Sequence, residues 1–216
     1  MNYFKLLSED IKCVKDRDPA ATSALEILLL YPGLKAVRAH RKAHWFYKHN
    51  MHFAARFISQ RSARKTNIEI HPGATIGRRF FIDHGTGVVI GETAEIGNDV
   101  TIYQGVTLGG TGKDVGKRHP TVGNGVMIGA GAKVLGPFTI GNNSSIAAGS
   151  VVLHAIPDNC TAVGAPARVV KQNGKRVDNL DQIHIPDPVA QEFEKLYKRI
   201  EQLENELTAL KGENKQ

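Results

Sequence analysis

The chain has 216 residues, of which 41% are hydrophobic and only 6% aromatic, and its 22 glycines are concentrated in the middle. Its two cysteines, Cys13 and Cys160, lie outside any metal-ligand spacing, which excludes a disulfide scaffold or cysteine-based zinc site and is typical of a reducing cytosol. The longest unbroken apolar stretch, residues 27–31, is too short to span a bilayer and no signal-peptide core is present, so we expect a cytoplasmic protein.

The net charge of +7 is concentrated in the first third, where residues 1–66 carry thirteen Lys and Arg against five Asp and Glu. Such an excess is compatible with nucleic acid, anionic lipid, an anionic substrate or a solvated helical face. Because no nucleic-acid motif accompanies it, we favour the solvated face and expect neither a nucleic-acid nor a membrane partner.

Residues 1–66 are predicted to form an N-terminal helical domain, because apolar residues recur there at spacings of three and four. Asp18-Pro19 is read as a helix start with proline at the first helical position, and Tyr31-Pro32-Gly33 as a break between helices. His40 and His44 have a helical i, i+4 spacing that could bind a metal, but no third ligand is evident, so no metal site is expected.

Residues 67–170 contain an aliphatic residue at every sixth position. A glycine often follows it directly, and a small or β-branched residue comes four positions later. The aliphatic positions are Ile70, Ile76, Ile82, Ile90, Ile96, Ile102, Leu108, Val122, Ile128, Val134, Ile140, Ile146 and Val152. This period is that of the hexapeptide repeat, in which three segments close one triangular coil of a parallel β-helix. Such coils are known to wind left-handed, an exception to the usual crossover rule.

The register of the repeat breaks twice, and both breaks carry ionisable residues beside glycines, where loop-borne function is expected. Ile82 to Ile90 spans eight residues and contains His84, an imidazole able to accept a proton near neutral pH. Glu69 lies fifteen residues upstream of His84, close to one coil of about eighteen residues. Glu69 is therefore a candidate to orient His84, whose alternative role is a structural histidine at a corner.

The second break, from Leu108 to Val122, spans fourteen residues and inserts a loop that contains Arg118 and His119. The planar guanidinium of Arg118 suits a carboxylate, and the glycines let backbone N–H groups approach an anion or a thioester oxygen. The loop sequence from Gly109 to Lys113 lacks the spacing of a P-loop and precedes no evident helix.

Residues 171–216 are predicted to form a polar linker and a C-terminal amphipathic helix. Its apolar residues alternate spacings of four and three over three heptads, which favours a coiled coil over docking on the β-helix. They are Val189, Phe193, Leu196, Ile200, Leu203, Leu207 and Leu210. The predicted fold class is therefore α+β: a helical domain over 1–66, a left-handed parallel β-helix over 67–170, and this segment over 171–216.

Several motifs together resemble the serine O-acetyltransferase family over roughly residues 1–171. They are Asp16-Arg17-Asp18-Pro19-Ala20, His44-Trp45, Glu69-Ile70-His71-Pro72-Gly73-Ala74, Ile82-Asp83-His84-Gly85-Thr86-Gly87, Thr107-Leu108-Gly109-Gly110-Thr111-Gly112-Lys113, Arg118-His119-Pro120, Gly125-Val126-Met127-Ile128-Gly129-Ala130-Gly131-Ala132 and Gly164-Ala165-Pro166-Ala167-Arg168. The hexapeptide alone indicates only the wider acyltransferase superfamily. The first register break around His84, the Arg-His-Pro loop and the N-terminal Asp-Pro-Ala motif are more specific.

The resemblance implies acetyl transfer from acetyl-CoA to the hydroxyl of L-serine, giving O-acetylserine for cysteine synthesis. It implies that His84 is the general base and that Glu69 orients it, although many members have aspartate at that position. It assigns the serine ammonium to Asp18 and Asp83 and the carboxylate to Arg118, with His119 also facing the substrate. The positions matching the CoA groove are Gly110, Thr111, Ala130, Ala148, Arg168 and Lys171.

We expect direct transfer without a metal, because neither cysteine falls in a register break where a covalent intermediate would form. Three alternatives are another hydroxyl acceptor such as homoserine or a sugar, a metal lyase of the γ-carbonic-anhydrase type, and a silent scaffold. The lyase needs paired histidine spacing, which the β-helix segment lacks, and a scaffold does not need the breaks. Serine is favoured because two carboxylates and one arginine suit a small zwitterion.

In this fold the coils typically assemble as trimers with sites between neighbouring subunits, so a homo-oligomer is expected, either a trimer or a dimer of trimers. Family members often bind cysteine synthase through a tail that ends in isoleucine. This chain ends in Glu213-Asn214-Lys215-Gln216, so we do not expect that partnership. Inhibition by cysteine is compatible with the family, but no residue pattern here indicates it.

Overall fold

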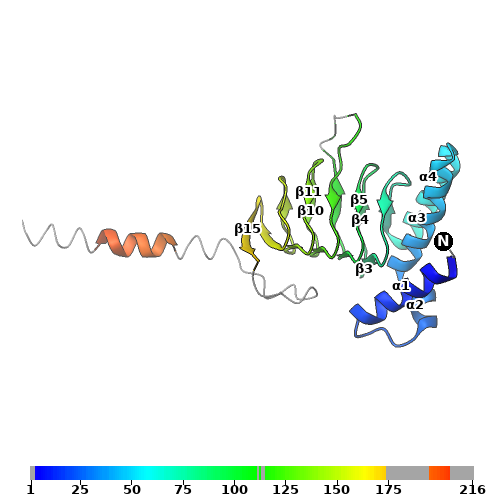
Figure 1. The fold of residues 1–216 in the computed structure, drawn as a ribbon, viewed down its shortest axis with the longest axis horizontal. Helices are drawn as coiled ribbons and strands as arrows, with labels where there is room; N and C mark the ends of the chain where they lie inside the picture. Colours follow the sequence, from blue (N-terminus) through cyan, green and yellow to red (C-terminus); the bar gives the residue numbers. More distant parts are fainter. Residues whose placement is uncertain (1–2, 111, 113–114, 174–194, 205–216) are drawn as a thin grey trace, which may run out of the picture. The chain divides into compact units, whose positions relative to one another are not determined.

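A computed structural model describes residues 3–110, 112, 115–173 and 195–204 (Figure 1). The N-terminal part contains helices α1 (Tyr3–Arg17), α2 (Ala24–Leu30), α3 (Pro32–Lys48) and α4 (His52–Thr66). The break expected at Tyr31-Pro32-Gly33 is confirmed, since α2 ends at Leu30 and α3 begins at Pro32. No helix among the described residues is long and apolar enough to cross a membrane.

The helix start predicted at Asp18-Pro19 is wrong. Helix α1 ends at Arg17, and Asp18 begins a turn in which its carboxylate accepts a hydrogen bond from the backbone N–H of Ala20. Helix α2 begins at Ala24 instead, because Ser23 and Glu26 form a reciprocal capping box that satisfies the first free N–H groups. A proline favours the first helical turn, but here this cap decides where the helix begins.

Short strands follow from residue 68 onwards. Their bounds are β1 Ile68–Ile70, β2 Thr75–Ile76, β3 Phe81–Ile82, β4 Val88–Ile90, β5 Glu95–Ile96, β6 Thr101–Ile102, β7 Thr107–Gly109, β8 Thr121–Val122, β9 Met127–Ile128, β10 Lys133–Leu135, β11 Thr139–Ile140, β12 Ser145–Ile146, β13 Val151–Val152, β14 Cys160–Gly164 and β15 Ala167–Gln172. The last helix, α4, ends at Thr66, and only Asn67 separates it from β1, next to the predicted boundary at 66/67.

The strands form three parallel sheets that we name faces. Face A contains β1-β4-β7-β10-β13, face B contains β2-β5-β8-β11, and face C contains β3-β6-β9-β12-β14, to which β15 adds antiparallel. From β1 to β13, successive strands along the chain visit A, B and C in turn, so each triplet closes one coil of a left-handed parallel β-helix (Figure 1). The predicted α+β fold is confirmed.

The repeat positions form the core of this β-helix. Every aliphatic position of the six-residue period is buried except Ile76, which is partly buried and packs against the same core. The small residues four positions later are buried as well, from Ala74 to Ser150. The period therefore predicted the inward-facing residues one by one, because each inward side chain stacks on the equivalent side chains of the coils beside it.

Both register breaks are confined to corners. Ile82 pairs with Ile102 on face C and Ile90 pairs with Leu108 on face A, so the strands on either side of the first break stay in register. The additional residues are held at the corner between faces C and A. The second break joins β7 on face A to β8 on face B, at the corner between these two faces.

Helices α1 to α3 pack against face C. The outward side chain of Phe81 on β3 is buried in a cluster with Cys13, Val14, Ile27 and Leu34. Gly33 lies directly on the end of β3, where a Cβ atom would be only 2.2 Å from the carbonyl oxygen of Ile82. The glycine is therefore required for the close approach of α3 to the strand that leads into the first break.

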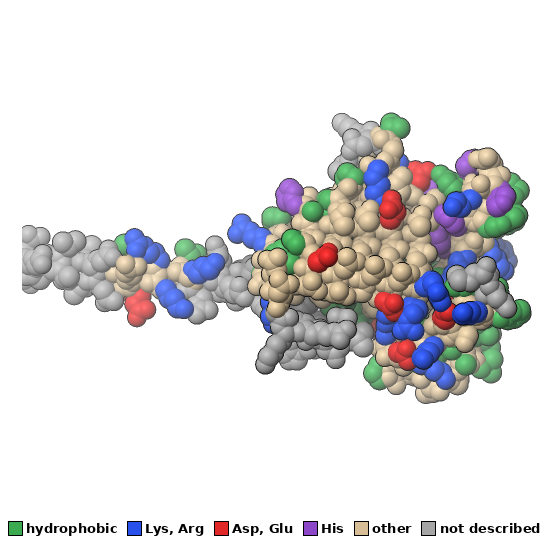
Figure 2. Space-filling model, viewed as in Figure 1, with side chains coloured by type: hydrophobic (Ala, Val, Ile, Leu, Met, Phe, Trp, Pro, Cys, Tyr) green, Lys and Arg blue, Asp and Glu red, His purple; other side chains and the backbone are tan. Residues whose placement is uncertain are grey.

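The positive charge of residues 1–66 is mostly exposed. Lys35, Arg38, Lys42, Arg61 and Lys65 line a shallow groove between α3 and α4. In Figure 2, Lys and Arg side chains gather over the helical part, whereas the visible β-helix surface carries few charges. Most of these charges are exposed, and the interpretation as a solvated helical face stays a prediction.

Residues 195–204 form a further helix. Leu196, Ile200 and Leu203, which belong to the predicted heptad pattern, are about half exposed, at 54%, 51% and 47%. The other heptad positions (Val189, Phe193, Leu207, Leu210) lie outside the described residues. The coiled coil therefore stays a prediction.

Candidate functional site

The first break is a tight turn built around His84. His84 has a φ of 54°, and Gly85 and Gly87 follow with φ of 84° and 75°, so three left-handed residues fall within four positions. The Gly85 N–H donates to the Asp83 carbonyl at 2.6 Å, and the Gly87 N–H donates to the Asn67 carbonyl at 2.8 Å. A non-glycine residue in this conformation is uncommon and often marks function. The turn leaves the His84 side chain exposed.

Asp83, the residue directly before His84, is electrostatically coupled both to this imidazole and to the carboxylate of Asp18. The Tyr31 hydroxyl donates to Oδ2 of Asp18 at 2.6 Å. Burial raises the pKa of Asp83, the nearby His84 lowers it, and the negative charge of Asp18 raises it further. Burial and the hydrogen bond to Asp18 also raise the pKa of Tyr31. Asp18, Tyr31, Asp83 and His84, which we name the bulge cluster, thus form an acidic site beside a potential base.

Arg118 and His119 lie at the other end of strand β4, where the long loop returns to the β-helix. Arg118 forms an ion pair with Glu92, whose second oxygen accepts a hydrogen bond from the Tyr47 hydroxyl at 2.9 Å. The Arg118 hydrogen bond, followed by that of Tyr47, lowers the pKa of Glu92. We name Tyr47, Glu92, Thr93, Arg118 and His119 the loop cluster.

His119 is held as a neutral imidazole. Its Nδ1 accepts from the backbone N–H of Thr93 at 3.2 Å and contacts the Thr93 hydroxyl at 2.9 Å, which assigns the ring proton to Nε2. The ring is buried across Gly91, where a Cβ would lie 1.9 Å from Cδ2, and burial lowers the pKa of His119. The Nε2 edge lies beside Gly110, at the start of the long loop.

The two clusters lie on different corners of the same coil. The bulge precedes β4 (Val88–Ile90) and the Glu92-Thr93 segment follows it, so about 10 Å of strand separates them along face A. No hydrogen bond or ion pair joins the two clusters within the part of the chain that the structure describes. One chain therefore presents two separate clusters, one with carboxylates and a histidine, the other with a guanidinium.

Glu69 lies on β1 between buried Ile68 and Ile70 and faces outward from face A. One of its oxygens accepts a long hydrogen bond, 3.4 Å, from the side-chain amide of Gln60. Among the described residues no hydrogen bond connects Glu69 with His84. The orienting role expected for Glu69 stays a prediction.

The residues matched to the CoA groove lie in three places. Ala130 and Ala148 lie on the corner between faces C and A, where Gly131 donates to Gln104 O and Gly149 to Ala130 O at 2.8 Å each. Arg168 and Lys171 lie on β15, which pairs with β14. Gly110 begins the long loop, and Thr111 lies outside the described residues.

One corner connects several of these positions with the bulge. Gly105 donates to the carbonyl of Thr86, two residues after His84, and the same ladder continues with Gly149 donating to Ala130, next to Ala148. At the last coil, the N–H of Gly164 donates to the Ser150 hydroxyl at 3.2 Å. A small-residue edge therefore runs along the β-helix axis from His84 towards the β14–β15 hairpin.

Sequence reasoning missed Tyr31, Glu92 and Thr93. Tyr31 was interpreted only as part of a helix break, and the other two stand in an ordinary corner of the repeat. Their partners lie 13 to 45 residues away in the chain, so only the folded structure places them together. In the described residues no group of three or more His, Cys, Asp or Glu has the arrangement of a metal site.

The sequence of residues 119–154 matches the family described as bacterial transferase hexapeptide (six repeats). Serine acetyltransferase from Bacillus subtilis (strain 168) is 60% identical over 206 residues, which are 95% of each chain. The structure of serine acetyltransferase from Brucella abortus strain S19 in complex with coenzyme A aligns with a TM-score of 0.77 at 46% identity, over 80% of this chain and 69% of that one. Soybean serine acetyltransferase complexed with serine aligns with a TM-score of 0.75 at 48% identity, over 77% and 68% of the two chains.

The coils and the matched repeats define a transferase of the hexapeptide class. The 60% identity to a relative over 95% of this chain narrows the class to one family. The chain belongs to the serine acetyltransferase family.

Proposed function

We propose that this protein transfers the acetyl group of acetyl-CoA to the hydroxyl of L-serine in the cytoplasm, giving O-acetylserine for cysteine synthesis. The proposal is supported by the family and by the complexes of related enzymes with coenzyme A and with serine. The observation that carries it is the bulge cluster at a break in the repeat, in which the exposed imidazole of His84 follows Asp83 directly and Asp83 interacts electrostatically with both His84 and Asp18.

His84 is the general base in this mechanism. A serine hydroxyl is a weak nucleophile until a base takes its proton during attack on the thioester carbon. The resulting oxyanion needs donors, which a backbone N–H near the glycine-rich loop would supply. As the tetrahedral intermediate collapses, the CoA thiolate leaves and His84 returns the proton to it. Glu69 would orient the imidazole through a contact formed when the site is assembled.

The bulge cluster and the loop cluster fit the two charged ends of serine. Asp18 and Asp83 attract the ammonium group, whereas Arg118 attracts the carboxylate and the Nε2–H of His119 is available as a donor. We propose that the bulge cluster of one subunit faces the loop cluster of its neighbour in a homotrimer. CoA then lies along the small-residue edge that contains Ala130 and Ala148, with the remaining groove positions Gly110, Thr111, Arg168 and Lys171 around it.

A thiol-release assay with acetyl-CoA and a panel of hydroxyl amino acids tests this function. We expect kcat/KM for L-serine to exceed that for homoserine by at least about tenfold, because one additional methylene alters a small pocket by that order. Preference for homoserine would contradict the substrate assignment, and no thiol release with any acceptor would contradict the activity.

Asp83→Asn is expected to raise KM for serine about 10- to 100-fold and to stabilise the fold slightly. Because burial raises the pKa of Asp83 above 3.8, the folded protein loses stability as the pH rises through this carboxyl group's titration. The asparagine removes that cost, so its Tm should exceed that of the parent by about 1–3 °C at pH 8. The difference should shrink as the pH falls through the raised pKa, where the carboxyl group of the parent becomes protonated. A lower Tm for the variant at pH 8 would contradict an unfavourable charge at Asp83.

A further inference from the structure

The last residue of α1, Arg17, is bonded to two coils of the β-helix at once. Its Nη1 donates to the carbonyls of Arg79 and Val100, each at 3.3 Å, and to the Thr101 hydroxyl at 3.0 Å. Its Nη2 donates to the carbonyl of Asp99 at 3.2 Å and to the carboxylate of Asp99 at 3.0 Å. The side chain is only 15% exposed. A planar guanidinium with five acceptors holds its helix end with little freedom.

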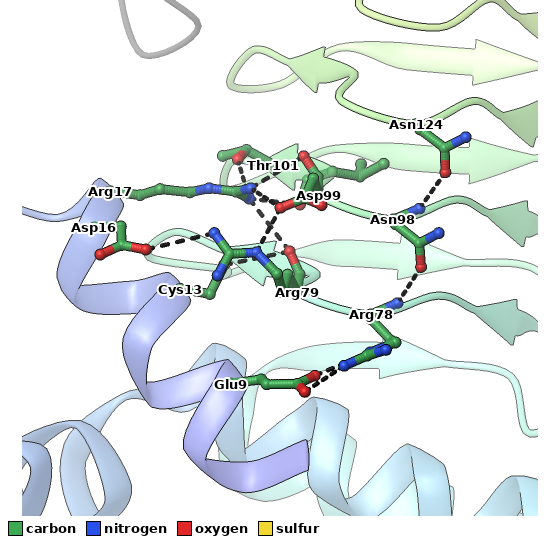
Figure 3. A network of polar contacts seen from close by, with 11 residues as sticks. Glu9, Cys13, Asp16, Arg17, Arg78, Arg79, Asn98, Asp99, Thr101 and Asn124 are labelled. Atoms are coloured by element: carbon green, nitrogen blue, oxygen red, sulfur yellow. Dashed lines mark hydrogen bonds and ion pairs between the residues drawn. The ribbon is translucent and has the colours of Figure 1, made fainter. Parts of the chain in front are cut away.

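The rest of α1 is fixed on the same side (Figure 3). The Cys13 thiol donates to the Arg79 carbonyl, and Arg79 in turn donates to Asp16 and, at 2.6 Å, to Asp99. One turn further towards the N-terminus, Glu9 pairs with Arg78. These contacts recur at helical spacing, so one face of α1 is attached along its length to the corner between faces B and C.

This attachment places the residue that follows Arg17. The backbone N–H of Asp18 donates to the Val14 carbonyl at 2.8 Å, so its backbone continues the geometry of α1. Its carboxylate is held separately: Oδ2 accepts from the Tyr31 hydroxyl at 2.6 Å and Oδ1 from the backbone N–H of Ala20 at 2.8 Å. Tyr31 lies two residues before Gly33. Gly33 packs closely against Ile82, the residue directly before Asp83. Backbone and side chain of Asp18 thus have different anchors.

We propose that Arg17 and Tyr31 are positioning residues that hold the Asp18 carboxylate at a fixed place beside Asp83 and His84, and so set the affinity for serine and its selection over homoserine. The inference rests on the proposed function, in which Asp18 binds the ammonium group. An aspartate whose backbone and carboxylate are each anchored accepts an ammonium group only at one distance from the base, which favours the shorter amino acid.

Tyr31→Phe removes one hydrogen bond and keeps the ring. We expect KM for serine to rise about tenfold, because the bond is to a charged group, while KM for acetyl-CoA stays within twofold. The ratio of kcat/KM between serine and homoserine should fall. Arg17→Lys keeps the charge but not the planar fork, and it should shift the same two quantities.

The matched control is Arg78→Gln, which breaks the Glu9 ion pair on the same face of α1 but lies away from Asp18. It should leave KM for serine unchanged. The reference variant is Asp18→Asn. The combined Asp18→Asn/Tyr31→Phe variant should raise KM for serine little more than Asp18→Asn alone, because Tyr31 acts through Asp18. A uniform loss of activity with a lower Tm in Tyr31→Phe would indicate a merely structural role and overturn the inference.

The outcomes separate the inference from the proposed function. If Asp18→Asn raises KM for serine but Tyr31→Phe and Arg17→Lys do not, the positioning role is wrong and the function stands. If Asp18→Asn itself leaves KM for serine unchanged, the ammonium site assigned under the proposed function is wrong. Additive effects in the combined variant would also overturn the inference, because Tyr31 would then act independently of Asp18.

Discussion

Replacing His84 by asparagine is expected to lower kcat by about two to four orders of magnitude, the usual contribution of a general base. Asparagine is the appropriate replacement because it tolerates the left-handed conformation that His84 adopts, with φ of 54°. His84→Ala should lose the same activity and should also lower stability, because alanine adopts the left-handed conformation less readily than asparagine. Since the side chain is exposed, the Tm of the asparagine variant should change little.

Thiol release at saturating serine and acetyl-CoA measures kcat directly. His154→Asn provides the matched control, because His154 is an exposed histidine of the β-helix segment outside both clusters. It should retain normal turnover. Near-normal turnover in His84→Asn would refute the general-base role, whatever the effect on KM.

Two impaired variants, co-expressed so that their subunits mix, should together recover activity that neither has alone. In a trimer whose sites lie between subunits, each site combines the bulge cluster of one chain with the loop cluster of the next. A His84→Asn chain supplies an intact Arg118, and an Arg118→Ala chain supplies an intact His84. With random mixing, about one quarter of the interfaces contain both intact residues, so about one quarter of the parent activity should return.

The control is co-expression of His84→Asn with Asp18→Asn. Both changes affect the bulge cluster of a single chain, so no interface regains an intact set and activity should stay low. Assays at subsaturating serine make the Arg118→Ala loss visible, because the missing guanidinium should raise KM for serine about 100-fold. If the first mixture recovers no more than the control, the two clusters belong to one chain or do not share a site.

Much of the fold follows from the sequence because a hexapeptide coil is local. The six-residue spacing predicts which aliphatic side chains from Ile70 to Val152 point into the core. The breaks at His84 and Arg118 are visible as departures from that spacing. The helical region was less predictable. Asp18-Pro19 looks like a helix start by composition, but the capping box of Ser23 and Glu26 decided the boundary.

The candidate site was predictable only in part. The register breaks indicated which residues are special, but not which of them meet. Glu69 is separated from His84 by nearly one coil in sequence, yet its bonded neighbour is Gln60 of α4. Tyr31 and Glu92 became visible only through contacts across the fold, with Asp18 and Arg118. Periodicity predicts position along the coil, whereas such partners depend on how helices and loops pack on it.

The way the first break is accommodated has a consequence for how such proteins change over time. The additional residues around His84 are held in one corner, and the strands before and after it keep their pairing, Ile82 with Ile102 and Ile90 with Leu108. An insertion of this kind alters neither the sheet nor the core, so it is nearly neutral for folding. New side chains can therefore be tried at a corner of the solenoid, and retained for their chemistry, without rebuilding the molecule that carries them.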